Sequence, residues 1–452
     1  MAEKKASKNK SRQERISGWE RLKGKNKEID AYCQEYMSFM SEVKTEREAV
    51  DYVKKVIGAY KGIGYLENRG KAIALWKKGK AGLKEGIRIV VAHIDSPRLD
   101  LKVNPLYEDT DIAMLKTHYY GGIKKYQWLA RPLAMHGRIA KEDGSVVDVV
   151  IGERDREPCF TIEDLLPHLA QKVQNNKKVS DAFEGERLNI IVGTRPDTGA
   201  KENKVKKAVL DLLKRNYNIE EEDFVSADLE IVPSGPAREI GLDSSMIGAY
   251  GHDDRSCAWA AVKALIDAKG LPFTSVVLLV DKEEIGSEGN TGAKSRFLEE
   301  AVWDIGEKLG SDIIPSRVLF RSLAISADVN GALDPDYPEV HEKTNAARLG
   351  YGICVTKFTG SRGKSGSSEA RAEYMAWIRS MLNKRNIPWQ TGELGKIDEG
   401  GGGTVAKYLA EYGMEIVDMG PALLSMHAPF EIASKVDLYS TYLAYRAFME
   451  EK

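Results

Sequence analysis

Two adjacent glutamates, Glu283 and Glu284, are the residues of this 452-residue chain best suited to carry out chemistry. They lie just beyond the apolar run 276–280, where a buried strand is expected to end. Carboxylates are costly at such a place unless their charge is compensated. A metal cluster would compensate it, with one glutamate as a ligand and its neighbour handling protons. The alternative is a solvated loop, so the metal hypothesis depends on other ligands at similar positions.

Other potential ligands follow apolar runs of the same kind. Short continuous apolar runs are typical of strands covered on both faces, as in parallel α/β sheets. Ligands of open α/β sheets bind outside the carboxyl ends of the strands, so we expect these side chains to converge on the glutamate pair. They are His93 and Asp95 after residues 87–92, Asp328 after residues 323–327, and His427 after residues 414–426.

A fifth segment adds two more carboxylates. Asp253 and Asp254 precede residues 256–267, whose small and apolar residues recur at helical spacing and end before Gly270. The pair therefore lies at the start of a helix. One interpretation is helix capping, which aspartate does well; the other is a contribution to the metal site.

Together, these segments resemble the co-catalytic dizinc aminopeptidases, and among them the M18 family of aspartyl and vacuolar-type aminopeptidases. The resemblance covers about residues 50–450 and includes Tyr120-Gly121-Gly122 and residues 130–133, 137–138 and 167–170. The shorter M42 aminopeptidases share the metal motifs, but the chain length and the Tyr-Gly-Gly segment favour M18. The five motifs are His-Ile-Asp from 93, His-Asp-Asp-Arg from 252, Asp-Lys-Glu-Glu-Ile-Gly-Ser from 281, Ser-Ala-Asp from 326 and Ser-Met-His-Ala from 425.

The resemblance implies two zinc ions per subunit, with Co²⁺ or Mn²⁺ as substitutes. It implies that Glu283 is the general base, taking a proton from the attacking water and passing it to the leaving amine. Asp95 would orient a ligand or tune the metal, and Asp253 would be only a neighbour. The implied metal ligands are His93 and Asp328 on one ion, Glu284 and His427 on the other, and Asp254 as the bridge.

Three further residues are predicted to contact substrate. Lys357 matches a lysine of the aspartyl aminopeptidases, which points toward acidic N-terminal residues. His168 is the counterpart of a family histidine that reaches an active site across a subunit contact, although Gln171-Lys172 lies nearer to the expected position. Gly402, in the run 400–403, is predicted to line the pocket, and a plain flexible loop is the alternative.

A second glycine-rich segment, 360–365, contains a Gly-Lys pair but is not a phosphate loop. A phosphate loop needs a glycine five residues before that pair, and position 358 is phenylalanine.

The predicted fold is an α/β/α sandwich with a mixed, largely parallel central sheet and an inserted β-rich domain. The metallopeptidase domain would be discontinuous, comprising residues 1–103 and 241–452. Residues 104–240 contain alternating strand-like segments and no ligand motif, and we expect them to form a dimerisation or lid domain. Residues 436–449 have the spacing of a closing amphipathic helix.

Composition excludes several classes of partner. The 67 basic and 68 acidic residues are balanced, so neither nucleic acid nor a membrane is expected as a partner. The Lys- and Ser-rich residues 1–15 lack an apolar core and are expected to be a disordered solubilising tail rather than a secretory signal. The four cysteines are far apart, which favours a reducing cytoplasm.

The predicted function is removal of N-terminal residues from peptides, with a preference for Asp or Glu. The family resemblance implies self-association, with dimers building a closed dodecameric shell. Alternatives are a neutral-preferring aminopeptidase of the vacuolar type, an M42-like aminopeptidase or deacylase, and a catalytically silent assembly protein of the same fold.

Overall fold

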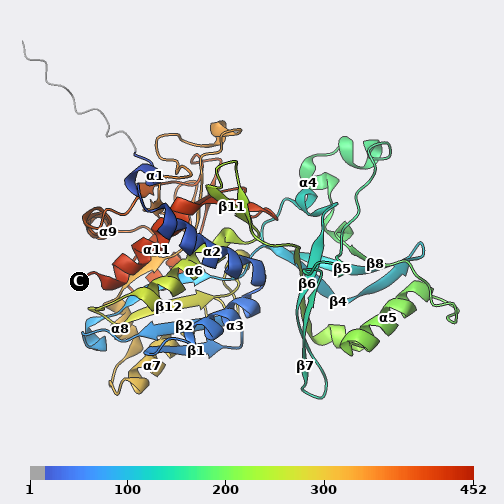
Figure 1. Cartoon of the computed structure of the whole chain (residues 1–452), viewed down its shortest axis with the longest axis horizontal. Helices are drawn as coiled ribbons and strands as arrows, with labels where there is room; N and C mark the ends of the chain where they lie inside the picture. Colours follow the sequence, from blue (N-terminus) through green and yellow to red (C-terminus); the bar gives the residue numbers. More distant parts are fainter. Residues whose placement is uncertain (1–15) are drawn as a thin grey trace, which may run out of the picture.

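Short apolar runs build the central sheet of the larger of two lobes (Figure 1). The computed structural model describes residues 16–452, so the predicted N-terminal tail lies outside the described residues. The sheet has eight strands: β1 (Ile63–Asn68), β2 (Ala72–Lys77), β12 (Ser275–Val280), β3 (Arg88–His93), β13 (Leu323–Ser326), β19 (Glu415–Gly420), β15 (Ile353–Thr356) and β17 (Trp389–Thr391), in that order.

The four central strands, β12, β3, β13 and β19, are parallel. Strands β2 and β15 flank them in the antiparallel sense, so the sheet is mixed. Parallel strands end at one edge, and this edge carries the predicted ligand segments. The chain therefore has a mixed α/β fold with several sheets.

Helices cover both faces of the central sheet, because alternate side chains of each buried strand point to opposite faces. In β3, Val90 and Ala92 belong to one apolar core, and Ile89 and Val91 belong to the other. The first core is completed by α2 (Asn26–Glu42), α3 (Glu46–Ile57), α6 (His252–Asp267), α9 (Ala372–Lys384) and α11 (Lys435–Glu450). The second core is completed by α7 (Phe297–Lys308), α8 (Pro315–Phe320) and α10 (Ala406–Ala410).

Two smaller sheets lie in the same lobe, which begins with the short helix α1 (Gly18–Arg21). The five-stranded sheet comprises β10 (Arg238–Ile240), β11 (Met246–Ala249), β21 (Glu431–Ser434), β20 (Ala422–Leu424) and β14 (Asn330–Gly331). The two-stranded sheet pairs β16 (Gly360–Ser361) with β18 (Gly401–Gly402), so the two glycine-rich segments of the sequence lie side by side.

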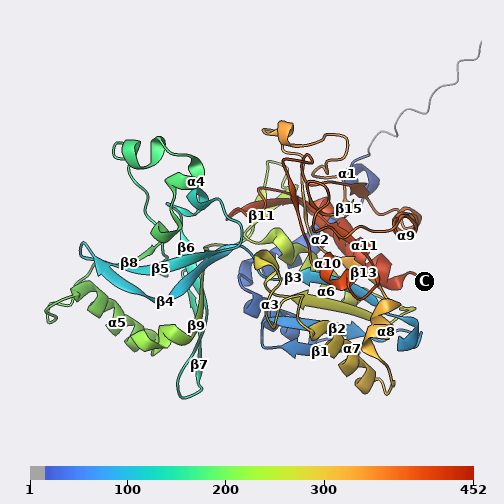
Figure 2. The same cartoon turned by 180° about the vertical axis from the view of Figure 1, so that it is seen from behind.

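The second lobe is a separate six-stranded sheet with its own apolar core and the helices α4 (Val179–Ala182) and α5 (Lys204–Tyr217) (Figures 1 and 2). Its sheet is formed by residues between 98 and 233, whereas the inserted domain was expected to span 104–240. Its strands, in order, are β7 (Val146–Ile151), β6 (Leu133–Ala140), β9 (Ala227–Pro233), β4 (Arg98–Asp109), β5 (Ile112–Tyr120) and β8 (Ile190–Gly193).

Across residues 16–452, no helix has both the length and the apolar character needed to cross a membrane.

Candidate metal centre

Four of the five predicted ligands, all but Asp254, line one pocket at the carboxyl ends of the parallel strands. His93 is the last residue of β3, and the glutamate pair begins a single helical turn, Glu283–Ile285, shortly after β12. Lys282 turns the chain there in a left-handed conformation, with φ of 67°. The pocket is lined by His93, Asp253, Glu283, Glu284, Asp328 and His427, among other residues.

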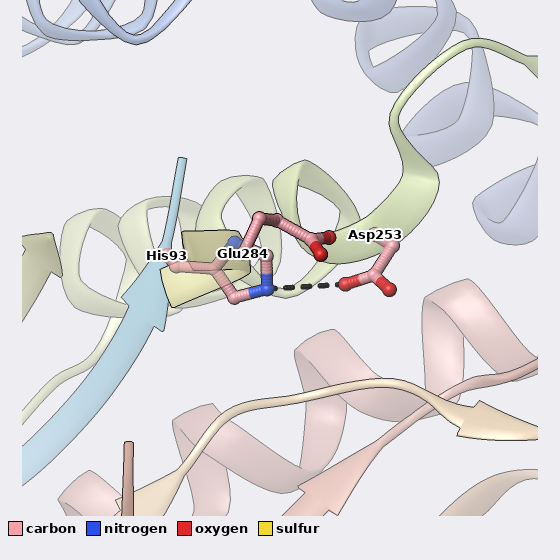
Figure 3. A group of neighbouring side chains, drawn as sticks. All are labelled: His93, Asp253 and Glu284. Carbon is pink, nitrogen blue, oxygen red and sulfur yellow. Dashed lines mark hydrogen bonds and ion pairs between the residues drawn. The ribbon is translucent and has the colours of Figure 1, made fainter. Parts of the chain in front are cut away.

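Asp253 lies between the two histidines. One of its carboxylate oxygens, Oδ1, is 3.1 Å from Nε2 of His93 (Figure 3). Its other oxygen, Oδ2, is 3.3 Å from Nε2 of His427. Glu284 Oε2 also approaches that histidine nitrogen, at 3.5 Å. A carboxylate that faces two imidazoles in this way has one oxygen available for each of two metal ions.

Asp254, the predicted bridge, has different neighbours from Asp253. Ligand atoms of Asp253, Asp254 and Asp328 lie within 4.8 Å of one another, as do those of His93, Asp253 and Glu284. Asp254 belongs only to the first group, and neither histidine ring is hydrogen-bonded to its carboxylate in the part of the chain described. The two neighbouring aspartates therefore face different surroundings.

The site's electrostatics fit a bound cation. Burial raises the pKa values of Asp254, Glu284 and Asp328 well above their usual range, and neighbouring carboxylates raise them further. Both carboxylate oxygens of Asp254 and Oε1 of Glu284 are buried without a hydrogen-bond partner among residues 16–452. Buried acidic oxygens of this kind require a proton or a metal ion. Imidazole nitrogens and carboxylate oxygens are ligands that zinc accepts.

Glu283 differs from its neighbour in being suited to proton transfer. It lines the same pocket, and burial raises its pKa to about 7; His93 and His427 act to lower this pKa, and Asp95 and Asp253 act to raise it. A carboxyl group with a pKa near neutrality can both accept and return a proton.

Asp95 orders the loop that carries the glutamate pair. The backbone amides of Glu283 and Glu284 donate to its two carboxylate oxygens at 3.1 and 3.2 Å, and the Tyr120 hydroxyl donates at 2.8 Å. Nδ1 of His93 lies 3.3 Å from the same carboxylate. The sequence predicted the contact with a ligand histidine, whereas the contacts with the glutamate amides required the structure.

Glu431 is a supporting residue that the sequence analysis missed. Its carboxylate accepts hydrogen bonds from the backbone amides of His427, at 2.6 Å, and Asp253, at 3.1 Å. Burial, followed by the charge of Asp253, raises its pKa to about 8. The sequence pattern that could have identified it is a single glutamate at the start of the buried strand β21, four residues after a ligand histidine.

The three predicted substrate residues lie in different environments. Gly402 lines the pocket. Lys357 does not; its amine lies 3.7 Å from Glu369, and the residues on either side of it in the chain line the pocket instead. His168 is exposed on the second lobe and is not among the pocket-lining residues of this chain. Basic residues that do line the pocket are Arg362, Lys364 and Lys396.

Comparison with known proteins identifies the family. The model of the family described as aminopeptidase I zinc metalloprotease (M18) matches residues 40–449. The chain belongs to the M18 family. The M18 members are hydrolases, and this chain is therefore a metalloaminopeptidase of the zinc-dependent class.

Individual M18 relatives match over nearly the whole chain. A probable M18 family aminopeptidase 1 from Clostridium acetobutylicum is 49% identical, over 96% of this chain and 97% of its own. The crystal structure of an M18 aminopeptidase from Thermotoga maritima superposes with a TM-score of 0.92 at 47% identity, covering 98% of this chain and all of the other. The S. cerevisiae mApe1 dodecamer shares the fold at 21% identity, with a TM-score of 0.74 and 94% and 97% coverage.

Proposed function

We propose that this M18 enzyme uses two zinc ions to hydrolyse the N-terminal residue from peptides. The observation that carries the proposal is the carboxylate of Asp253 between the imidazoles of His93 and His427. Our proposal gives the bridging role to Asp253 in place of Asp254, and these two contacts support it. The remaining ligands would be His93 and Asp328 on one ion and Glu284 and His427 on the other.

Bound zinc would polarise the scissile carbonyl and lower the pKa of the attacking water. The protein supplies the proton transfers. Glu283 would accept a proton from the attacking water at its carboxylate and deliver it to the leaving amine. Asp95 holds the backbone of Glu283 and Glu284 through their amides, which keeps the base and a ligand in fixed relation.

A panel of aminoacyl-coumarin substrates, each with a free or an acetylated α-amine, tests the reaction class. The proposal predicts hydrolysis of the free-amine substrates and none of the acetylated ones. Cleavage of the acetyl group itself would support the deacylase alternative. No hydrolysis by zinc-loaded protein would support the silent assembly alternative, although the grouping of His93, Glu283 and His427 in one pocket speaks against it.

A preference for acidic N-terminal residues stays a prediction. Two basic side chains that line the pocket, Arg362 and Lys396, support it; Lys364 also lines the pocket, but its amine lies 3.0 Å from Glu369. The pairing of Lys357 with Glu369 does not favour Lys357 as the residue that reads the substrate. Glu393 lines the same pocket, so a neutral-preferring enzyme is the alternative that the substrate panel would reveal.

We also propose that the second lobe makes a subunit contact on the way to a closed dodecamer. A run of exposed apolar side chains on this lobe supports a contact surface: Leu165, Leu166, Leu169, Val173 and Val179. His168 lies within this run, so its predicted reach into a partner's active site depends on the same contact. Light scattering on the full chain tests the assembly, and a monomer at micromolar concentration would refute it. A cytoplasmic location also stays a prediction.

A further inference from the structure

The segment Tyr120–Gly122, at the end of β5, contacts two sides of the candidate metal centre. Strand β5 belongs to the second lobe (Figure 1), and the segment at its end contacts Asp95 and His427 before the chain continues into β6 of the same sheet. We propose that it is a positioning element through which the second lobe sets the orientation of Glu283, Glu284 and His427. The inference rests on the proposed function and assigns Tyr120 as a positioning residue.

Tyr120 acts on the glutamate pair through Asp95. Its hydroxyl donates to Oδ2 of Asp95 at 2.8 Å, and the same oxygen accepts the amide of Glu284 at 3.2 Å. The other carboxylate oxygen accepts the amide of Glu283 at 3.1 Å. The phenol therefore fixes the rotation of the carboxylate to which both glutamates are attached. Buried hydrogen bonds of this kind restrict rotation because breaking one leaves a polar group unpaired.

The Tyr120 ring is itself held by the second lobe. It pairs with Arg98 across the β4–β5 ladder, and the Arg98 guanidinium lies 4.0 Å from the ring centroid. Arg98 is buried between Glu46 of α3 and Glu230 of β9, with nitrogen–oxygen distances of 3.3 Å to each. One buried cation thus connects both lobes to the face of the ring.

Gly122 acts on the other side of the centre. Its carbonyl oxygen accepts a hydrogen bond from Nδ1 of His427 at 2.9 Å, which leaves Nε2 of that ring to face Asp253. A hydrogen bond at one imidazole nitrogen fixes which nitrogen is available as a ligand. The approach is close, since a Cβ on residue 122 would be in van der Waals contact with His427 Nδ1, at 3.4 Å.

Gly121 completes the turn between these two contacts. Its φ of +73° is in the left-handed region, and a Cβ there would lie 3.3 Å from the Cβ of Glu284. Because Tyr120 is bonded to Asp95 and Gly122 to His427, with only Gly121 between them, a tilt of β5 would move the base and the ligands together.

The test replaces Tyr120 by phenylalanine and measures zinc affinity with a chromogenic chelator, together with kcat and KM on the substrates of the panel. Residues that hold a metal ligand in place typically contribute about 10–100-fold to metal affinity or activity. We therefore expect Tyr120→Phe to lower zinc affinity and kcat about tenfold, with KM unchanged. Tyr119→Phe is the matched control. Tyr119 precedes Tyr120 in β5 and its side chain is exposed, so this variant should behave as the wild type.

The double variant Asp95→Asn/Tyr120→Phe makes the test specific to the proposed route. If Tyr120 acts through Asp95, the double variant should lose no more zinc affinity and no more kcat than Asp95→Asn alone. Additive losses would overturn the route, and wild-type zinc affinity and kcat in Tyr120→Phe would overturn the proposal, even if its melting temperature fell. The chelator measurement does not depend on peptide hydrolysis, so failure of the proposed function would be visible separately.

Discussion

Oδ1 of Asp253 lies 3.1 Å from Nε2 of His93, whereas neither imidazole is hydrogen-bonded to the carboxylate of Asp254 among the described residues. We predict that Asp253→Asn lowers zinc affinity by at least about tenfold. Asp254→Asn should have a smaller effect, because the two imidazole Nε2 atoms approach the carboxylate of Asp253 and not that of Asp254 among the described residues. Zinc content after dialysis against a weak chelator would distinguish the two variants; a greater loss in Asp254→Asn would restore Asp254 as the bridge.

Replacing the two adjacent glutamates should separate base from ligand. Glu283→Gln removes the proton acceptor and should lower kcat by about 10²–10⁴-fold while zinc remains bound. Glu284→Gln should release zinc, because its carboxylate approaches His427 within the cluster. Metal content and turnover are measured on the same preparations. Exchange of these two behaviours would show that the assignment of the pair is wrong.

Substrate preference should depend on the basic residues that line the pocket. Lys396→Ala is expected to lower kcat/KM for aspartyl substrates about two- to fivefold relative to leucyl substrates, the scale of a solvent-exposed ion pair. Lys357→Ala serves as the comparison, since its amine lies beside Glu369 outside the pocket lining. A selective loss on aspartyl substrates in Lys357→Ala alone would assign the role to Lys357, as the sequence suggested.

A buried histidine between the lobes predicts how stability depends on pH. His136 of β6 donates to Glu48 at 2.7 Å and to Glu153 at 3.0 Å. Burial works against the charged imidazole, but these two carboxylates raise its pKa to about 9. The histidine pKa in an unfolded chain is about 6.5, so the contribution to folding is complete below that pH and is lost as pH rises through about 9.

The size of this contribution is on the order of 3 kcal/mol. Chemical denaturation of wild type and His136→Gln between pH 6 and pH 9.5 measures it. The difference in unfolding free energy should shrink as pH rises. His118→Gln, at an exposed position of β5, is measured alongside for comparison. A constant difference for His136→Gln across the range would contradict the predicted protonation.

The position of the site was predictable because strand ends are local features of a sequence. The apolar run that became β12, Ser275–Val280, ends just before the glutamate pair, and β3 ends at His93 itself. Parallel pairing then brings such ends together. The closing helix was expected at 436–449 and is observed as α11, Lys435–Glu450, because its apolar spacing is equally local.

The direction in which individual side chains point could not be predicted in the same way. Asp253 and Asp254 are neighbours at a helix start. Which of the two faces the histidines depends on the backbone angles there, such as the ψ of 108° at Asp253. Glu369 lies twelve positions after Lys357, and only the folded loop shows that the two approach each other. Glu431 contacts Asp253 across a separation of 178 residues, a relation that no sequence spacing reveals.

The most direct test of the account is a zinc titration of the metal-free, full-length chain, with hydrolysis of leucyl- and aspartyl-coumarin recorded at each step. The account predicts no hydrolysis without metal, because water activation and carbonyl polarisation depend on the ions. It predicts a rise to a plateau at two equivalents of zinc per chain. Full activity in verified metal-free protein, or a plateau at one equivalent, would contradict the dizinc mechanism.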